Sequence, residues 1–600
     1  MVKHKHEEKL TAKKPTSKKP EVKKPVDKYG VILKRIGIKA ARIISRTSLP
    51  EIAFISSFIF GHYLLNADFQ YPGEIILPII IFAILATVIF YLMRLITKSW
   101  LAARISSLAL IYALYSYSYL PRWLQSSGKF FLPKHFETTF SNATLSVVIL
   151  AILCAALGYG LARLAREAKF MKGLQLHKIV LFAVLFIFAI QGLKVVNKIN
   201  IYHRQMSYQY PKPDLKRAPG ATITKPDIYY FVFDRYGSND TLQKVYGINN
   251  NPLTDYLAGQ GFVNRLDAKA NYPFTMESIS STMAMQYHTG LMQLFGNAKQ
   301  QTAFPYRSIF NDPPIAQVLK QNGYIYNQLS SWWDFTRVGV QADGNQTKSF
   351  RLRAFGKNYY LSDLTRDVVN KSILSPWLKK GLTFGKTMVI KYDNDNNPRE
   401  NFYAQEAAVK QIASSPSSVP QFTFTHFLAP HDPYIFDSDG SDPTYDGGRN
   451  DYGEDETVKY KEEITYLNTQ IRDIMGYIRL HSPNAVIVIQ SDEGPYPKEF
   501  RFDLSPGHYY DPANLPLDQE KQKFGVLASY YMPGVDAATV QQNITSSVNP
   551  FRFILKQYLG YDINMLPDCQ FATGDKYVIY KYENETPKLQ TNPPAACNSL

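Results

Sequence analysis

Five apolar stretches fill the first third of this chain and constrain its fold more than any other feature. They cover residues 49–66, 75–97, 103–120, 143–162 and 177–196. Each is close to the roughly 20 residues that an α-helix needs to cross a bilayer. We therefore predict a five-helix transmembrane domain over residues 48–197. The first stretch carries Glu51 and His62, so it is also consistent with a helix that lies at the membrane interface.

The charges of the connecting loops predict how the chain crosses the membrane. Residues 1–47 are dense in lysine, and the second and fourth connections carry clusters of Lys and Arg, whereas the first connection, ADFQYPGE, has none. Lys and Arg near helix ends remain in the cytoplasm. With five spans and a cytoplasmic N-terminus, everything after about residue 197 lies outside the cytoplasm. We therefore expect a multi-pass protein of the plasma membrane, in contact with membrane lipids.

The basic N-terminal segment accounts for much of the formal net charge of +17. Runs such as TAKKPTSKKPEVKKPVDK contain repeated Pro and few residues that could form a core. We predict that residues 1–47 form a disordered cytoplasmic tail, since such compositions cannot bury enough apolar surface. A polybasic segment beside a membrane is attracted to anionic lipid, and we expect no nucleic acid among the partners.

The rest of the chain has the pattern of an α/β domain. A polar, Pro-containing linker over 198–224 leads to a domain over 225–582, and 583–600 is expected to be a loose tail. β-rich apolar runs alternate with helical patterns, which predicts a mostly parallel sheet covered by helices on both faces. The expected strands are 227–234, 324–329, 421–428, 485–491 and 525–532, and the expected helices are 311–322, 457–479 and 548–559.

Acidic residues follow two of these expected strands. The run VIVIQSDEGPYP ends in Asp492 and Glu493, and DIYYFVFDRYG ends its apolar run at Asp234. Open α/β sheets place their chemistry at the carboxyl ends of strands, so these carboxylates could converge on one cation. Alternatively, Asp234 and Asp492 simply cap the turns that follow the strands.

The three cysteines point to no metal or redox motif. Cys154 lies in the fourth apolar stretch, and Cys569 and Cys597 lie near the C-terminus, without CxxC spacing. The last two could form a disulfide outside the cell, or remain two free thiols.

Several spaced motifs together resemble the alkaline phosphatase/sulfatase superfamily, in its membrane-anchored branch with lipoteichoic acid synthases and phosphoethanolamine transferases. The motifs are DIYYFVFDRYG, NYPFTMESISSTM, THFLAPHDPY, VIVIQSDEG, FGVLASYYMPG and VNPFRFILKQYLG, in family order across about 225–560. The resemblance implies an extracytoplasmic α/β/α sandwich behind five membrane helices.

The resemblance also implies a nucleophile at a helix N-terminus beside a metal. Thr275 matches that position best, and Ser278 is the runner-up. A cation and a helix dipole favour the ionised hydroxyl there. In the alternative interpretation Thr275 only N-caps the helix, and Glu277, Ser278 or Ser281 point into solvent. The absence of a Cys-x-Pro-x-Arg string argues against a true sulfatase.

The expected metal site departs from the family pattern. Relatives commonly read Ser-Asp-His-Gly where this chain reads Ser491, Asp492, Glu493, Gly494. The resemblance then implies Asp234, Thr275, Asp492 and Glu493 as ligands, all through oxygen, which favours Mn²⁺ or Mg²⁺ over Zn²⁺. Alternatively, Glu493 does not ligate, or the site is inactive.

Three histidines are candidates for binding the substrate or moving a proton. By resemblance His431 contacts the substrate, and His508 corresponds to a histidine that follows the metal strand. We expect both to be catalytic, as general acids or bases. His426 is a further candidate for substrate binding, although its place at a strand end is equally consistent with a structural role.

These features predict a metal-dependent phosphotransferase or phosphodiesterase that acts through a covalent phospho-threonine. The expected donor is a lipid-linked phosphoester, and the acceptor is an envelope glycan, an alcohol or water. The alternatives are a sulfuric-ester or phosphonate hydrolase of the same fold, and a catalytically inactive envelope binding protein.

Overall fold

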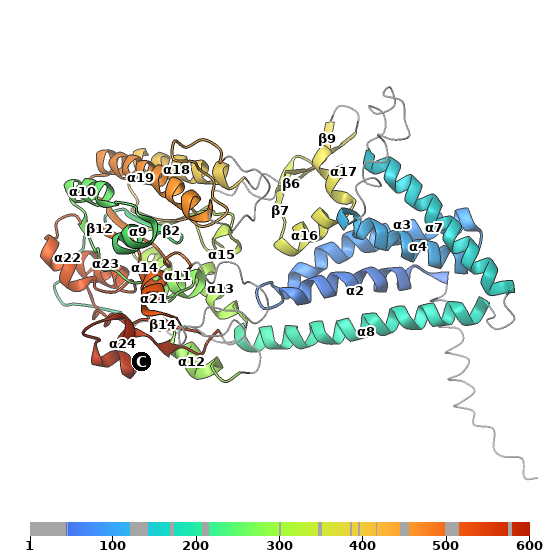
Figure 1. Ribbon diagram of the computed structural model, residues 1–600, viewed down its shortest axis with the longest axis horizontal. Coiled ribbons are helices and arrows are strands. Elements are labelled where there is room, and N and C mark those ends of the chain that lie inside the picture. Colours follow the sequence, from blue (N-terminus) through green and yellow to red (C-terminus); the bar gives the residue numbers. More distant parts are fainter. Residues whose placement is uncertain are drawn as a thin grey trace, which may run out of the picture.

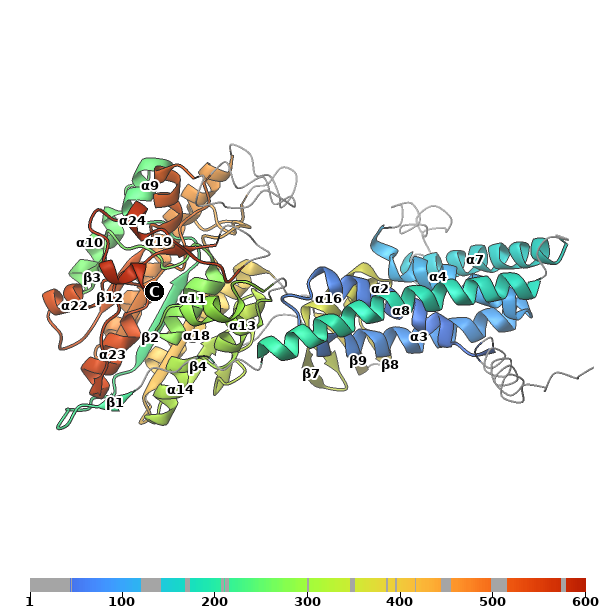
Figure 2. The ribbon, with the colours of Figure 1, turned by 90° about the horizontal axis from the view of Figure 1, so that it is seen from below.

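The computed structural model shows helices that run side by side at one end and a rounded α/β domain at the other (Figures 1 and 2). The structure describes residues 44, 46–119, 142–167, 173–206, 210, 215–298, 302–345, 351–384, 387–393, 397–415, 417–443, 455–497, 515–573 and 579–600. Nearly all of the predicted basic tail, 1–47, therefore lies outside the described residues.

A seven-stranded sheet forms the centre of the α/β domain, in the order β3-β12-β11-β2-β10-β4-β5. Its strands are β2 (Ile228–Phe233), β3 (Val263–Asn264), β4 (Ile325–Leu329), β5 (Gly344–Asn345), β10 (Gln421–Phe427), β11 (Val486–Gln490) and β12 (Ala528–Tyr531). The strands from β11 to β5 pair in parallel, whereas β12 and β3 pair antiparallel. The prediction of a mostly parallel sheet is confirmed, with an antiparallel edge.

Helices cover both faces of this sheet because its central strands are apolar on both sides. Along β2, Ile228, Tyr230 and Val232 belong to one hydrophobic core, and the alternate residues belong to the other. The first core includes α11 (Thr275–Ala284), α12 (Thr289–Phe295), α13 (Phe304–Asn311), α14 (Pro314–Gln321), α22 (Ala537–Asn543) and α23 (Pro550–Leu559). The second includes α9 (Asn239–Tyr246), α10 (Asn251–Gly259), α18 (Pro398–Ser414) and α19 (Asp455–His481).

The five apolar stretches form five helices, but the prediction that all five are long enough to span is wrong. The helices are α2 (Leu49–Leu65), α3 (Ile76–Thr97), α4 (Trp100–Tyr115), α7 (Asn142–Glu167) and α8 (Gly173–Met206). Within the described residues, three segments are long and apolar enough to cross a membrane, namely Pro72–Thr97, Val147–Leu164 and Lys178–Met206. The helices α2 and α4 have only 17 and 16 residues.

The short helices α2 and α4 also hold charged groups between them. Glu51 and Arg104 form a fully buried ion pair, and Ser107 donates a hydrogen bond to Glu51. A charged pair within apolar helices is expected to face the interior of the helix bundle. Glu51, which made the first apolar stretch also consistent with an interfacial helix, is therefore part of the internal packing of the bundle.

A second, four-stranded antiparallel sheet was not predicted. It has the order β7-β6-β9-β8, with β6 (Arg351–Ala354), β7 (Lys357–Tyr360), β8 (Leu382–Phe384) and β9 (Thr387–Asp393). With α16 (Asp363–Lys371) and α17 (Leu374–Lys380) it lies beside the membrane helices (Figure 1). Leu364, Val368 and Ile373 enter the hydrophobic core of those helices.

The α/β domain contacts the helical bundle through α13. The Phe304 ring packs edge-on against Tyr202 near the end of α8, at 4.8 Å between centroids. Backbone N–H of Ala303 donates to the carbonyl of Asp68, and Arg307 lies over the ring of Tyr71. The first part of the predicted linker, up to Met206, is thus helical and continues α8.

The C-terminal segment 583–600, expected to be loose, is packed against the domain. It contains β15 (Glu583–Asn584), α24 (Thr586–Leu589) and the 3₁₀ turn η5 (Ala595–Asn598), and β15 pairs with β14 (Phe571–Ala572). Cys569 and Cys597 form a disulfide and are both buried. Of the two possibilities left open for these cysteines, the structure contains the bridge. Cys154 is a buried free thiol.

Candidate metal centre and nucleophile

Three neighbouring parallel strands deliver two carboxylates and one imidazole to one edge of the sheet. In register, Val232 of β2 lies between His426 of β10 and Gln490 of β11. Asp234 follows β2 directly, and Asp492 follows β11 by two residues. Because parallel strands end at the same edge, the three side chains meet although they are far apart in sequence.

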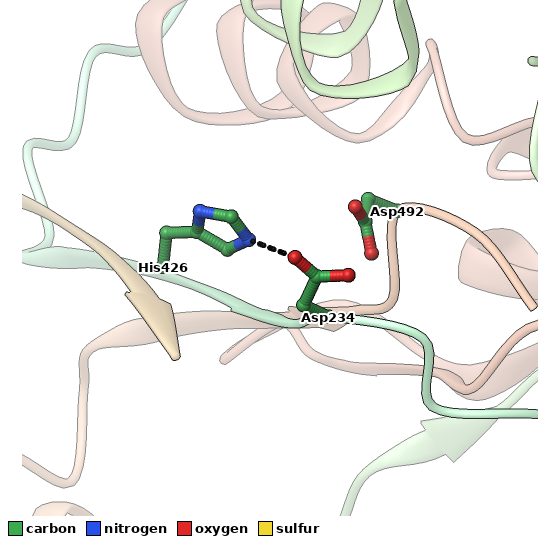
Figure 3. A group of neighbouring side chains, drawn as sticks. All are labelled: Asp234, His426 and Asp492. Atoms are coloured by element: carbon green, nitrogen blue, oxygen red, sulfur yellow. Dashed lines mark ion pairs between the residues drawn. The ribbon is translucent and has the colours of Figure 1, made fainter. Parts of the chain in front are cut away.

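Asp234, His426 and Asp492 form a compact buried group (Figure 3). Their ligand atoms all lie within 4.8 Å of one another, and His426 Nε2 is 3.3 Å from Asp234 Oδ2. Asp234 Oδ1, Asp492 Oδ2 and His426 Nε2 are buried and have no hydrogen-bond partner within the described residues. Buried polar atoms are normally satisfied, so these residues fit a divalent cation.

The His426 ring is held so that one nitrogen faces the carboxylates. Its Nδ1 lies 3.0 Å from the Oγ1 of Thr336, which is fully buried, and Trp333 packs edge-on against the ring. A metal-binding histidine commonly uses its second nitrogen in this way to fix the orientation of the ring. The His426 side chain therefore has the position and orientation that a nitrogen ligand would need, a role that the sequence interpretation did not give it.

Burial strongly perturbs the protonation of the three groups. Desolvation raises the pKa of Asp492 to about 8 and that of Asp234 to about 6, and neighbouring carboxylates add to both shifts. Desolvation lowers the pKa of His426 to about 4. The pocket thus disfavours net negative charge, and a bound cation would offset that cost.

Thr275 lies at the start of α11, beside this group. Phe274 is the N-cap of that helix and Thr275 is its first helical residue. Thr275 is therefore not the N-cap that the alternative interpretation expected. Its side chain is half-buried and lies close enough to Asp492 to lower the pKa of that carboxyl group. Ser278, Ser281 and Glu277, which the alternative interpretation placed in solvent, are all buried.

Glu493 is held by two basic side chains. Its Oε1 accepts from Arg235 Nε at 2.9 Å, and its Oε2 lies 2.9 Å from Lys523 Nζ. Burial alone would raise the pKa of Glu493, but Lys523 and Arg235 hold it below its ordinary value. Lys523 is itself fully buried on α21 (Leu517–Phe524), and burial lowers its pKa to about 8. We call Glu493, Arg235 and Lys523 the ion triad.

An aromatic ring and a loop complete the surroundings of the ion triad. The Tyr496 ring lies beneath both cations, 4.5 Å from Arg235 Cζ and 3.6 Å from Lys523 Nζ. Arg235 Nη1 also donates to Asp432 at 2.8 Å, and Asp432 Oδ1 is 3.3 Å from Nδ1 of His431. Arg235 and His431 thus lie on the accessible side of the centre, while Lys523 lies beneath it.

The profile of the sulfatase family matches residues 226–560. The chain belongs to the sulfatase family, within the alkaline phosphatase superfamily. This match covers the central sheet, Thr275, the buried metal-binding group and the ion triad.

Solved structures with a similar fold are distant from this sulfatase-family chain. The C-terminal periplasmic domain of EcEptC from Escherichia coli is 13% identical, with 62% of this chain and 95% of that chain covered and a TM-score of 0.37. The soluble domain of lipooligosaccharide phosphoethanolamine transferase A from Neisseria meningitidis is 12% identical, with coverages of 59% and 94% and a TM-score of 0.35. A putative sulfatase from Bacteroides thetaiotaomicron is 11% identical, with coverages of 62% and 76% and a TM-score of 0.33. No curated protein matches this chain.

The sulfatase-family domain brings together most of the residues expected at the site. Asp234, Asp492 and Thr275 meet, and His431 is close enough to lower the pKa of Asp234. His508 lies outside the described residues. The role of Glu493 as a ligand stays a prediction. In the structure its carboxylate is paired with the other two members of the ion triad, Arg235 and Lys523. The sequence interpretation missed Arg235 and Lys523; the only signal for Arg235 is its position next to Asp234.

Proposed function

We propose that this chain is a membrane-bound, metal-dependent enzyme that transfers or hydrolyses phosphoesters through a covalent phospho-threonine on Thr275. The observation that carries the proposal is the position of Thr275 at the start of α11, close enough to Asp492 to lower the pKa of that carboxyl group. Asp492 Oδ2, Asp234 Oδ1 and His426 Nε2 are buried beside it, with no hydrogen-bond partner among the described residues. A hydroxyl at a helix N-terminus next to a cation is placed to act as a nucleophile.

The proposed cation site consists of Asp234, His426 and Asp492, with Thr275 at its open side. A divalent cation bound there would stabilise negative charge on the reacting oxygens. The preference for Mn²⁺ or Mg²⁺ rested on an all-oxygen set that included Glu493. His426 adds a nitrogen ligand, which both Zn²⁺ and Mn²⁺ accept. We therefore propose a divalent cation and do not choose among Mn²⁺, Mg²⁺ and Zn²⁺.

The charge of the site suits an anionic substrate once a cation is bound. Asp234, Asp492, Glu493 and Asp432 are acidic, and Arg235 and Lys523 are basic, which gives a net charge of −2 when all are ionised. A divalent cation makes the site neutral, and Arg235 then lies on the accessible side as a donor to phosphoryl oxygens.

The proposed reaction has two steps. The Thr275 oxygen attacks phosphorus in line and the bond to the leaving oxygen breaks, with His431 placed to give that oxygen a proton. The phospho-threonine is then attacked by an acceptor hydroxyl or water, which regenerates Thr275. We propose a lipid-linked donor, with an envelope glycan, an alcohol or water as acceptor, because the domain is held beside the bilayer by α8. His508 stays a predicted proton carrier.

We further propose that the domain lies outside the cytoplasm. The loop charges favour a cytoplasmic N-terminus, and an odd number of spans places the domain on the opposite side whether three or five helices cross.

The proposal is tested by intact-mass analysis of the full chain in lipid nanodiscs, supplied with Mn²⁺, Mg²⁺ or Zn²⁺. We expect a phosphoryl-containing adduct on the wild type, its loss in Thr275→Ala, and its retention in Ser278→Ala. Loss in Ser278→Ala alone would move the nucleophile to Ser278. No adduct and no metal binding would support a binding protein instead.

Metal binding separates the two possible ligand sets. We expect His426→Ala to abolish tight binding of the cation in calorimetric titrations, while Glu493→Gln retains it. The opposite result would restore Glu493 as the ligand. Turnover of an aryl sulfate but not an aryl phosphodiester would favour a sulfuric-ester hydrolase, although none of the three cysteines lies at the site to serve as the nucleophile.

A further inference from the structure

A hollow of about 400 Å³ opens between α2 and α8. One wall is formed by Gly61, Leu64 and Leu65 at the end of α2, and the other by Gln191, Lys194, Asn197 and Lys198 of α8. The two helices pack together, with Phe60 stacked on Phe188 at 5.6 Å between centroids. We call this hollow the α2–α8 groove.

The polar wall of the groove is a stripe on an otherwise apolar helix. Residues 191, 194, 197 and 198 are spaced by three or four, so they share one face of α8. Its neighbours Ile190, Leu193 and Val196 are exposed and apolar, as expected of a surface that faces lipid. An ionisable side chain in such a segment is costly and usually has a function, and Lys194 lies within a candidate span.

The depth of the groove matches the headgroup region of a bilayer. α8 has 34 residues, which is about 51 Å, so it exceeds the roughly 30 Å hydrocarbon core. The groove lies between 8 and 15 residues before the end of α8 at Met206, on the side of the α/β domain. Lys198 is also 2.7 Å from Asp68, which belongs to the loop that contacts α13.

The groove has the charge and polarity of a phospholipid site. Lys194 and Lys198 contribute +2 and Asp68 contributes −1, which leaves +1. One phosphodiester monoanion would neutralise that charge, and Leu64 and Leu65 offer an apolar surface to the glycerol and the start of an acyl chain. A zwitterionic lipid would place a second cation beside the lysines.

We propose that the α2–α8 groove binds one anionic glycerophospholipid of the leaflet on the side of the α/β domain. The phosphate lies against Lys194 and Lys198, and the acyl chains follow the apolar wall of α2. The inference does not depend on the chemistry at Thr275. It requires only that α8 crosses the membrane.

Two glycines provide a matched test. A Cβ atom at Gly61 meets nothing within 4 Å, so Gly61→Leu fills the groove without disturbing the helix packing. A Cβ atom at Gly160 of α7 also meets nothing within 4 Å, but Gly160 does not line the groove, so Gly160→Leu is the control. Lys194→Gln removes one charge and keeps the volume.

The full chain is purified in detergent, supplied with equal amounts of dioleoyl phosphatidylglycerol and dioleoyl phosphatidylcholine, and analysed by native mass spectrometry. We expect one retained phosphatidylglycerol on the wild type and on Gly160→Leu, its loss in Gly61→Leu, and about a fivefold weaker retention in Lys194→Gln. Equal retention of the two lipids by the wild type would overturn the proposal. So would the same retention in the Gly61→Leu and Gly160→Leu variants.

Discussion

Glu277 is a buried carboxyl group, and replacing it by Gln should stabilise the protein at neutral pH. The side chain is 2% exposed, and its Oε2 has no hydrogen-bond partner within the described residues. Desolvation raises its pKa from 4.5 to about 8, with Glu493 adding to the shift. The folded protein therefore holds Glu277 protonated at pH 7, whereas the unfolded chain ionises it.

The size of the effect follows from this difference. Between pH 4.5 and 8 the folded state binds a proton that the unfolded state has lost, so the wild type loses stability as the pH rises. At pH 7 the cost is about 1.4 kcal/mol for each of 2.5 pH units, or about 3.5 kcal/mol. Gln mimics the protonated form and removes this cost.

The assay is thermal unfolding of the chelator-treated full chain in detergent at several pH values. With an unfolding entropy of roughly 2.1 cal/mol/K per residue over the roughly 375 residues of the outer domain, Glu277→Gln should raise Tm by about 4 °C at pH 7. At pH 4.5 most of the gain should vanish, because Glu277 is then protonated in the folded state and in half of the unfolded chains. Metal is removed because a nearby cation would favour the carboxylate.

The exposed Glu583 provides a matched control, since Glu583→Gln should leave Tm unchanged at both pH values. A Tm of Glu277→Gln that is lower than wild type at pH 7, or shifted equally at pH 4.5 and pH 7, would refute the reasoning. A lower Tm at pH 7 would mean that the ionised form contributes to stability, and an equal shift at both pH values would mean that folding does not raise the pKa of Glu277.

Three further predictions concern other buried groups. Lys523→Met should lower the free energy of unfolding by about 3–5 kcal/mol, because it leaves the buried Glu493 with one cation. The double variant Lys523→Met/Glu493→Met should recover most of that free energy in denaturant titrations. Equal losses in the single and the double variant would contradict this. Replacing Cys569 and Cys597 by Ser opens a bridge over 28 residues and should cost about 2–4 kcal/mol in the same assay, so an unchanged midpoint would argue against it. Burial lowers the pKa of His288 to about 3, so the wild type loses stability as the pH falls below 6.5. The difference in the free energy of unfolding between the wild type and His288→Gln should change by about 1.4 kcal/mol per pH unit between pH 6 and 4. A difference that stays constant over this range would contradict the prediction.

The main sheet and its helices were predictable because their patterns are strong. The buried strands β2 and β11 are nearly continuous apolar runs, and the expected ends lie within two residues of Phe233 and Gln490. The number of membrane-spanning helices was less predictable, because apolar composition does not show where a helix begins or ends. The stretch 103–120 is apolar to its end, yet α4 begins at Trp100 and stops at Tyr115.

The second sheet could not be predicted from its sequence. Its strands have three to seven residues and mix charged with apolar side chains, as in Arg351–Ala354 and Lys357–Tyr360. Such short strands carry little periodicity. They pack against α16 and α17, and residues of these helices in turn enter the core of the membrane helices. Their signal lies in tertiary contacts that sequence patterns do not contain.

The metal-binding group shows most clearly what sequence patterns leave out. The resemblance placed Glu493 among the ligands because it stands where relatives commonly have a histidine. In the structure its charge is balanced by Lys523, 30 positions later, and by Arg235. A carboxylate that already faces two cations has less to offer a metal ion than His426, whose Nε2 is buried without a hydrogen-bond partner in the described part of the chain. In the proposed centre, the neighbouring strand β10 would supply the nitrogen ligand through His426, so a glutamate at position 493 is compatible with a metal site. The ion triad carries a net charge of +1, and Lys523 Nζ lies 5.8 Å from the ring of Phe274, the residue before the proposed nucleophile Thr275. A positive charge near that position would stabilise a transferred phosphoryl group.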